Sequence, residues 1–307
     1  MNKIAFIFPG QGSQYIGMGK EFVENFPEAR EIMEKAENAL DIDLMNLCFN
    51  GPLDELSSTE NTQPAIYTVS YMINEILIQK GVHPHFAAGH SLGEYSALAA
   101  ARVFSFEDGL GLVRKRGLIM KNAFPEGKGA MAAIIGLEDK TVESICKKVQ
   151  GDCEIANYNS PGQLVISGER EAVLEACQLA EIEGALKTVE LKVSGPFHSS
   201  LMKSAEKKLA EELALLEFKR PVYPVVSNVT AGFTREPDQI KRHLIDQLSG
   251  SVRWVESMNL LISENVDIFV EVGPGKVLRG LMKRINKSVK TYNVEDLKSL
   301  QSLLEKI

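Results

Sequence analysis

Short apolar runs alternate with amphipathic stretches along most of this 307-residue sequence. The runs, such as KIAFIF at 3–8, are long enough for one buried strand and far shorter than a membrane span. The stretches between them repeat apolar residues at three- and four-residue spacing, as amphipathic helices do. This alternation is typical of an α/β protein, so we predict that fold class with a mainly parallel sheet.

The same pattern gives the approximate ends of the elements. Strands are predicted at 3–8, 85–90, 267–273 and 289–294, and helices at 64–79, 91–102, 106–124, 276–285 and 295–307.

The middle of the chain follows a different order. It contains a strand at 129–136, a helix at 138–150, a hairpin at 153–168, a helix at 170–185 and a strand at 186–193. This β-α-β-β-α-β order is the ferredoxin-like plan. We therefore predict an inserted small subdomain at 125–196 and a large subdomain formed by 1–124 and 197–307.

Composition and charge restrict the class of protein. Apolar residues make up 44% and charged residues 24%, which excludes a disordered chain, a coiled coil or a small disulfide scaffold. The 34 basic and 41 acidic residues give a net charge of −7, so we expect no nucleic-acid partner. The four cysteines form no C-x-x-C pair, and we recognise no signal peptide or membrane span. A cytoplasmic protein without a membrane partner is expected.

Residues 89–93, Gly-His-Ser-Leu-Gly, fit the pattern G-x-S-x-G between a predicted strand and a predicted helix. This is the context of a nucleophile elbow, in which the glycines remove Cβ atoms that would collide with neighbouring elements. Backbone amides at the start of the helix could then stabilise an oxyanion. We predict that Ser91 is a nucleophile; the alternative is a serine that only caps the helix.

A nucleophilic serine needs a base, and the chain has histidines at positions 83, 85, 90, 198 and 243. His90 adjoins Ser91, and adjacent side chains at a sharp turn point apart. The pair at 83 and 85 lacks a third ligand close in sequence, so we expect no metal site. His198 lies in a Gly-Pro loop at the predicted subdomain junction, where functional residues concentrate, and is our candidate base.

Arg116 interrupts the apolar face of the predicted helix 106–124, between Leu112 and Met120 on the helical wheel. A buried guanidinium needs an anion, because an unpaired buried charge is strongly destabilising. The anion could be an internal Asp or Glu, or it could be a carboxylate of the substrate, which arginine binds well with its fork of donors.

Six motifs together resemble those of the malonyl-CoA:acyl-carrier-protein transacylase family, in the same order and over nearly the whole chain. They are FPGQGSQ (8–14), GHSLGE (89–94), RKRG (114–117), PFHS (196–199), VRW (252–254) and EVGPGKVL (271–278). The resemblance implies an α/β-hydrolase-like large subdomain with a ferredoxin-like insertion, in agreement with the predicted order of elements.

The resemblance also implies roles for individual residues. Ser91 resembles the nucleophile that becomes malonylated, and His198 its general base. Gln11 and Leu92 resemble the two residues whose backbone amides form the oxyanion hole.

Three further residues resemble those that select or support the substrate. Arg116 resembles the residue that pairs with the malonyl carboxylate. Gln247 resembles the glutamine whose backbone carbonyl orients the histidine in place of a triad acid. Phe197 resembles the bulky residue of malonyl-selective relatives, where methylmalonyl-selective relatives have a smaller one.

The implied activity is transfer of a malonyl group from malonyl-CoA to the phosphopantetheine thiol of acyl carrier protein, through a malonyl-serine intermediate, in fatty-acid biosynthesis. Such a two-step transfer uses two substrates and no metal or redox cofactor. We expect a monomer that offers the acidic carrier protein a local basic surface. The candidates for that surface are Lys115, Lys187, Lys192, Lys283 and Arg284.

Two other functions share part of this pattern. A serine esterase or thioesterase of the α/β-hydrolase type also has G-x-S-x-G, but it gives no reason for Arg116 or for FPGQGSQ. A non-catalytic docking domain would have no need of the serine, the histidine and the arginine together.

Overall fold

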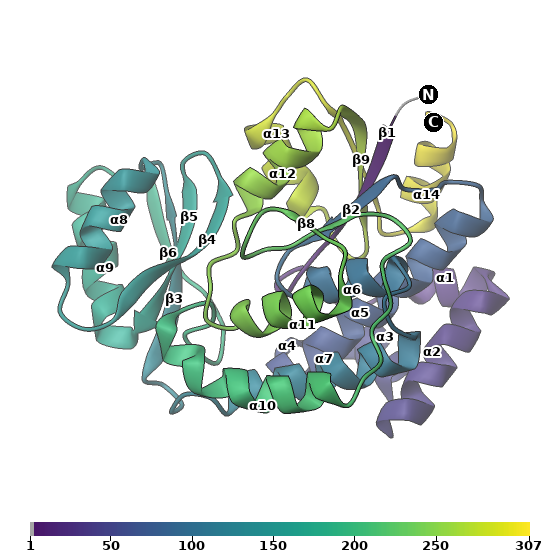
Figure 1. Cartoon of the computed structure of the whole chain (residues 1–307), viewed down its shortest axis with the longest axis horizontal. Coiled ribbons are helices and arrows are strands. Elements are labelled where there is room, and N and C mark those ends of the chain that lie inside the picture. The colour runs from purple at the N-terminus through teal and green to yellow at the C-terminus, as the bar shows by residue number, and fades with distance from the viewer. Residues whose placement is uncertain (1–2) are drawn as a thin grey trace.

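The computed structural model describes residues 3–307 and divides their strands between two sheets (Figure 1). The larger sheet has the strand order β10-β9-β1-β2-β7-β8. Its strands are β1 (Lys3–Phe8), β2 (Phe86–Gly89), β7 (Val225–Val226), β8 (Phe233–Thr234), β9 (Val266–Val272) and β10 (Lys290–Val294). Neighbours are parallel from β10 through β7, and the last pair is antiparallel. The predicted fold class is confirmed.

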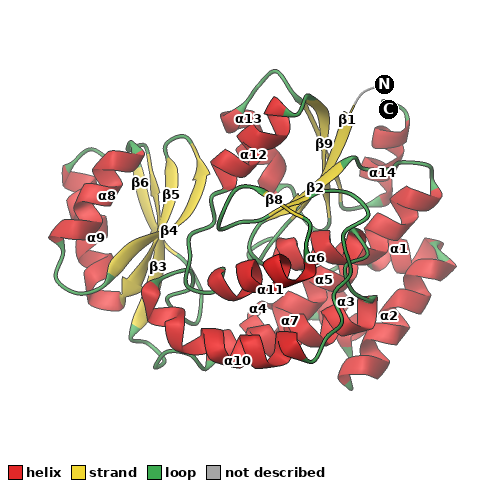
Figure 2. Ribbon diagram, viewed as in Figure 1, coloured by secondary structure: helices red, strands yellow, loops and turns green. Residues whose placement is uncertain are grey.

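Helices cover both faces of the larger sheet (Figure 2). They are α1 (Lys20–Asn25), α2 (Pro27–Leu40), α3 (Leu44–Asn50), α4 (Leu53–Ser57), α5 (Thr59–Gln79), α6 (Leu92–Ala100), α7 (Phe106–Lys121), α10 (Lys203–Ala214), α11 (Pro237–Asp246), α12 (Trp254–Ser263), α13 (Val277–Ile285) and α14 (Leu297–Leu304), with a short 3₁₀ turn, η1 (Ser200–Met202). Phe6 and Phe8 of β1 belong to the same core as α5 and α6, whereas Ala5 and Ile7 belong to the core with α12 and α13. This period-two alternation explains why the strand is apolar from Ile4 to Phe8. None of the described helices is both long and apolar enough to cross a membrane.

The smaller sheet is antiparallel, with the strand order β4-β5-β3-β6. Its elements are β3 (Gly129–Ile135), α8 (Asp139–Lys148), β4 (Cys153–Ser160), β5 (Gln163–Glu169), α9 (Arg170–Ile182) and β6 (Lys187–Glu190), which is the predicted β-α-β-β-α-β order. One face of the sheet packs on α8 and α9. Residues on the other face, including Met131 and Val165, join the core of the larger part. All these elements lie inside 125–196, although the division of the chain at those residues stays a prediction.

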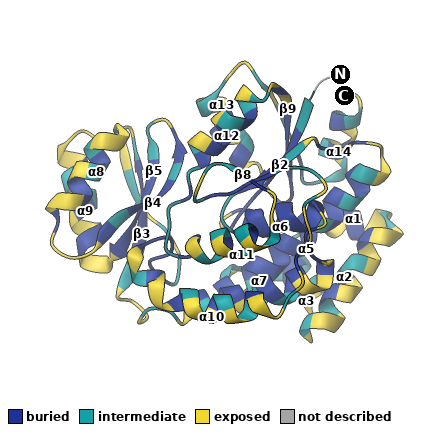
Figure 3. Ribbon diagram, viewed as in Figure 1, coloured by how far each residue is buried: buried dark blue, intermediate teal, exposed yellow. Residues whose placement is uncertain are grey.

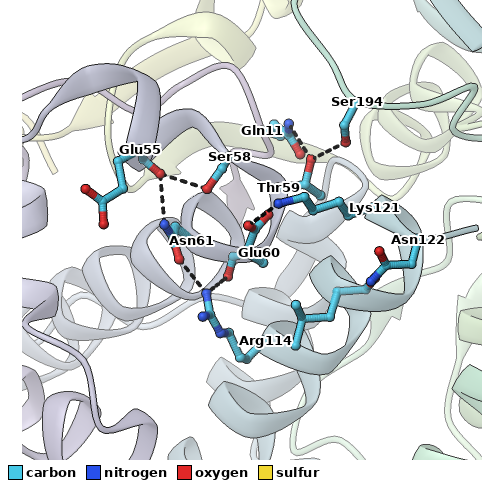
Figure 4. Close-up of polar contacts among 11 residues, drawn as sticks. Gln11, Glu55, Ser58, Thr59, Glu60, Asn61, Arg114, Lys121, Asn122 and Ser194 are labelled. Carbon is cyan, nitrogen blue, oxygen red and sulfur yellow. Dashed lines mark hydrogen bonds and ion pairs between the residues drawn. The ribbon is translucent and has the colours of Figure 1, made fainter. Parts of the chain in front are cut away.

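The predicted elements are all present with ends within three residues, except that α5 begins five residues before the predicted start at 64. The predicted helix starts at Pro64, a residue that cannot donate the hydrogen bond of a helix interior. The Glu60 carbonyl that Pro64 leaves without an amide partner accepts instead from Arg114 of α7, which also contacts Asn61 (Figure 4). A partner from another helix therefore allows α5 to start at Thr59.

Candidate active site

The turn between β2 and α6 presents Ser91 in a strained conformation, with φ 51° and ψ −107°. A Cβ on Gly89 would lie 1.9 Å from the carbonyl of Gly93, and a Cβ on Gly93 would lie 2.0 Å from the Phe8 carbonyl oxygen. The collisions that the G-x-S-x-G pattern predicts are therefore confirmed. All nine residues of α6 are buried, so the turn rests on a rigid support (Figure 3).

His198 faces the serine, with Nε2 2.8 Å from Ser91 Oγ. Its Nδ1 lies 2.8 Å from the Gln247 carbonyl oxygen and 3.2 Å from that of Gly250. Because carbonyls only accept, Nδ1 carries the proton and Nε2 is free to accept the proton of the serine. Burial, and after it the charge of Arg116, lowers the pKa of His198 to about 3, so the imidazole is neutral near pH 7.

His90 lines the same cavity as Ser91 but forms no hydrogen bond with its hydroxyl. Its Nε2 lies 2.7 Å from Asn159 Oδ1, and its ring is tilted against Trp254. Among residues 3–307, no group of three His, Cys, Asp or Glu side chains could hold a metal ion.

Gln11 and Leu92 line the same cavity as Ser91, and their roles in an oxyanion hole stay a prediction. Within residues 3–307, neither backbone amide donates a hydrogen bond to another part of the chain, so both are available to a ligand. The Gln11 side chain donates to Thr59 Oγ1 at 3.4 Å, and that hydroxyl lies 3.0 Å from Ser194 Oγ (Figure 4). These contacts link the Gln11 loop to α5 and to the segment that leads to His198.

Arg116 is 1% exposed, and its Nη2 lies 3.2 Å from Ser91 Oγ. Nη1 donates to Gln63 Oε1 at 2.9 Å, Nη2 donates to Gln247 Oε1 at 2.8 Å, and the guanidinium stacks over Tyr95. No Asp or Glu of the described residues forms an ion pair with it, so an internal salt bridge does not explain its burial. The guanidinium lacks a contacting anion, and it faces the nucleophile.

Phe197 is 4% exposed and forms part of an apolar wall of the cavity. The other members of that wall are Met120, Met131, Leu191 and Val193. The cavity lining therefore combines the cationic Arg116 with several apolar side chains, which suits a short acyl chain that ends in a carboxylate.

Gln247 contributes more than the predicted backbone carbonyl. Its side chain is fully buried, and Nε2 donates to Ser91 O at 3.1 Å, to Glu94 Oε2 at 2.7 Å and to Asn228 Oδ1 at 3.2 Å. The residue therefore contacts both the serine turn and Arg116.

Three polar residues of the site were not predicted: Gln63, Glu94 and Asn228. Asn228 accepts from the Ser91 amide at 2.7 Å and donates to the Gly89 carbonyl, which holds both sides of the serine turn. Burial raises the pKa of Glu94 to about 7, against the opposing effects of Asn228, Gln247 and Arg116. A helical wheel of 92–100 would have shown Glu94 among apolar neighbours, as the wheel of 106–124 did Arg116. No such signal exists for Gln63, whose nearest neighbours on a wheel are Ser70 and Asn74, or for Asn228.

The chain was compared with known proteins. A family model described as "Acyl transferase domain" matches residues 5–303. The "Malonyl CoA-acyl carrier protein transacylase" of Bacillus subtilis (strain 168) is 47% identical over 308 residues, covering 99% of this chain and 97% of that protein. A crystal structure of the transacylase of that name from Clostridium perfringens is 44% identical, with a TM-score of 0.95 over 99% of this chain and 96% of that one. A malonyl-transacylase in complex with a type II PKS acyl-carrier protein is 42% identical, with a TM-score of 0.97 over 99% and 100% of the two chains.

Proposed function

Because the chain belongs to the acyl transferase domain family, we infer that it transfers the malonyl group of malonyl-CoA to the thiol of acyl carrier protein. The observation that carries this inference is the buried Arg116 guanidinium, which lacks a contacting anion and lies 3.2 Å from the nucleophilic oxygen. A malonyl group is the short acyl group that brings a carboxylate to that position.

In the first step, His198 Nε2 takes the Ser91 proton while Oγ attacks the thioester carbonyl of malonyl-CoA. The carbonyl oxygen becomes an oxyanion, which the amides of Gln11 and Leu92 stabilise. The C–S bond then breaks, and His198 returns the proton to the leaving CoA thiolate. The product is a malonyl ester on Ser91 with both groups back in their starting protonation states.

In the second step, the phosphopantetheine thiol of the carrier protein gives its proton to His198 and attacks the ester. The same oxyanion forms and collapses, the C–O bond breaks, and Ser91 recovers its proton. The Gln247 and Gly250 carbonyls stabilise the transient imidazolium at Nδ1, where a Ser-His-Asp triad would use a carboxylate. Protons and electrons balance without a metal or redox cofactor, so we propose that none is used.

Several features of the site bear on partners and organisation. Acyl carrier protein is the second substrate, and all catalytic groups come from one chain, which supports action as a monomer. We propose that 125–196 is an insertion which closes the cavity over a catalytic subdomain formed by 1–124 and 197–307. All four cysteines are free thiols, which supports the proposed cytoplasmic location.

We propose a role in fatty-acid biosynthesis.

An esterase would use the same serine and histidine but would deliver the acyl group to water. It would leave the buried positive charge without a function, so the geometry favours the transferase.

The proposed function is tested by intact-protein mass spectrometry after mixing with malonyl-CoA, followed by addition of holo-acyl carrier protein. We expect one malonyl adduct, absent in Ser91→Ala, and its quantitative discharge onto the carrier. Release of free malonate at the same rate with and without carrier would identify an esterase instead. An adduct that persists in Ser91→Ala would refute the choice of nucleophile.

A further inference from the structure

The carboxylate of Glu94 lies buried beside the nucleophile and takes no part in the proposed acyl-transfer steps. It belongs to the first turn of α6, and the residue is 1% exposed. Its Oε2 accepts hydrogen bonds from the Asn228 backbone amide at 3.1 Å and from Gln247 Nε2 at 2.7 Å. Burying a carboxylate is costly, so a contribution of Glu94 to the site has to come through these two contacts.

The Glu94 contact fixes which way the Gln247 amide points. Nε2 faces Glu94, Asn228 Oδ1 and the Ser91 carbonyl, which are all acceptors, whereas Oε1 faces the Arg116 Nη2 donor at 2.8 Å. A flipped amide would place an oxygen against three acceptors and an NH₂ group against a guanidinium. Glu94 is the acceptor closest to Nε2 among the three, so it contributes most to this orientation.

Gln247 transmits this orientation to both sides of the reacting centre. Its side-chain oxygen holds the Arg116 guanidinium beside Ser91, and its backbone carbonyl accepts from His198 Nδ1 at 2.8 Å. Because the side chain is fully buried, Gln247 has no water to replace a lost partner.

On the premise of the proposed malonyl transfer, we propose that Glu94 is a positioning residue that acts through the Gln247 amide to hold Arg116 ready for the malonyl carboxylate. The neutral amide between them matters. A direct carboxylate-guanidinium pair would have to break whenever the substrate bound, whereas the amide oxygen orients Arg116 without cancelling its charge.

The proposal predicts that the length and acceptor capacity of residue 94 matter more than its charge. Glu94→Gln keeps an acceptor oxygen at the same reach and removes the charge. Glu94→Asp keeps the charge but withdraws the acceptor by one methylene, and Glu94→Met removes the acceptor at similar volume. The readout is kcat and KM for transfer from malonyl-CoA and from acetyl-CoA to holo-acyl carrier protein.

We expect the malonyl-to-acetyl ratio of kcat/KM in Glu94→Gln to stay within about threefold of the parent. In Glu94→Asp and Glu94→Met it should fall at least about tenfold, the cost of leaving roughly one buried donor without its acceptor, mainly through a higher KM for malonyl-CoA. If Glu94→Met does not fold, the comparison of the malonyl-to-acetyl ratio between Glu94→Gln and Glu94→Asp still tests the proposal. If Glu94→Asp kept the parent's ratio and Glu94→Gln lost it, the charge of residue 94 would be the important property and the proposal would be overturned. A ratio unchanged in every folded variant would overturn it too.

Glu271 provides the matched control. It is a fully buried carboxylate that accepts from the amides of Leu278 and Arg279 at the start of α13, away from Arg116. Glu271→Met should lower the melting temperature without changing the malonyl-to-acetyl ratio, and a matching fall in its ratio would show that loss of any buried carboxylate has this effect. A parent protein that transfers no malonyl group would refute the proposed function, an outcome distinct from failure of the Glu94 proposal.

Discussion

Replacing Arg116 with alanine is the perturbation that most directly tests how the site selects its substrate. The carboxylate carbon of a malonyl ester lies three bonds from Ser91 Oγ, and Arg116 Nη2 lies 3.2 Å from that same oxygen. The guanidinium is therefore within reach of the carboxylate in the intermediate, in a site from which water is largely excluded. Acetyl groups, which lack the carboxylate, gain nothing from this contact.

The expected magnitude follows from burial. Truncating one partner of a buried, hydrogen-bonded charge pair costs about 2–5 kcal/mol. At about 1.36 kcal/mol per factor of ten, kcat/KM for malonyl-CoA should fall about 30- to 5000-fold. Acetyl-CoA should lose less than about tenfold, because it loses only the ordering of Ser91, Gln63 and Gln247 around the guanidinium. For Arg116→Lys the loss of kcat/KM for malonyl-CoA should be smaller than for Arg116→Ala, because lysine keeps the charge but lacks the paired donors of the guanidinium.

The assay measures transfer from both donors to holo-acyl carrier protein. Glu107→Ala is the control on the same helix, because Glu107 is exposed and is not among the basic residues expected to bind the carrier protein. The control should keep the parent's kcat/KM for both donors. Equal losses for malonyl and acetyl donors in Arg116→Ala would show that Arg116 is structural and refute its assignment to the carboxylate.

Two further predictions concern the apolar wall and the base. Phe197→Ser should enlarge the cavity beside His198 and raise the use of methylmalonyl-CoA relative to malonyl-CoA, and an unchanged preference in donor competition would remove Phe197 from the selective wall. Because burial lowers the pKa of His198 from 6.5 to about 3, acylation of Ser91 should show no acid limb near pH 6.5. By linkage, the stability that this histidine contributes is present above pH 6.5 and is lost as the pH falls toward 3. Rates should be measured in the parent and in Glu94→Gln, since Glu94 titrates near 7 in the same site; an acid limb at 6.5 in both would contradict a neutral buried base.

Elements whose apolar pattern extends over several turns or a whole strand were predictable from sequence, and short ones were not. Both faces of β1 are buried from Ala5 to Phe8, so its sequence is apolar after Lys3 and identifies a strand without any knowledge of its neighbours. Helices α1 and α4 have six and five residues, too few for an apolar face to repeat. The start of α5 depends on Arg114 of another helix, a contact that no local pattern encodes.

The same distinction applies to the site. The strand, the glycines and the helix that position Ser91 are adjacent in sequence, and Arg116 is conspicuous on an apolar helix face. Glu94 and Gln247, by contrast, are 153 residues apart, and what each does depends on the other. An asparagine such as Asn228 is ordinary in a loop until the fold brings it to the amide of Ser91.

Backbone strain explains why these long-range contacts bear on activity. Ser91 and His198 both adopt positive φ, 51° and 59°, a conformation that non-glycine residues hold only when their surroundings enforce it. The Ser91 amide donates to Asn228, and the His198 amide donates to the Leu248 carbonyl at 3.1 Å, so both strained residues are held by partners distant in sequence. A chain could therefore keep all six sequence motifs and still misplace its nucleophile and base if residues around 228 and 247 changed. The motifs specify which groups react, whereas the polar contacts outside them determine whether those groups meet.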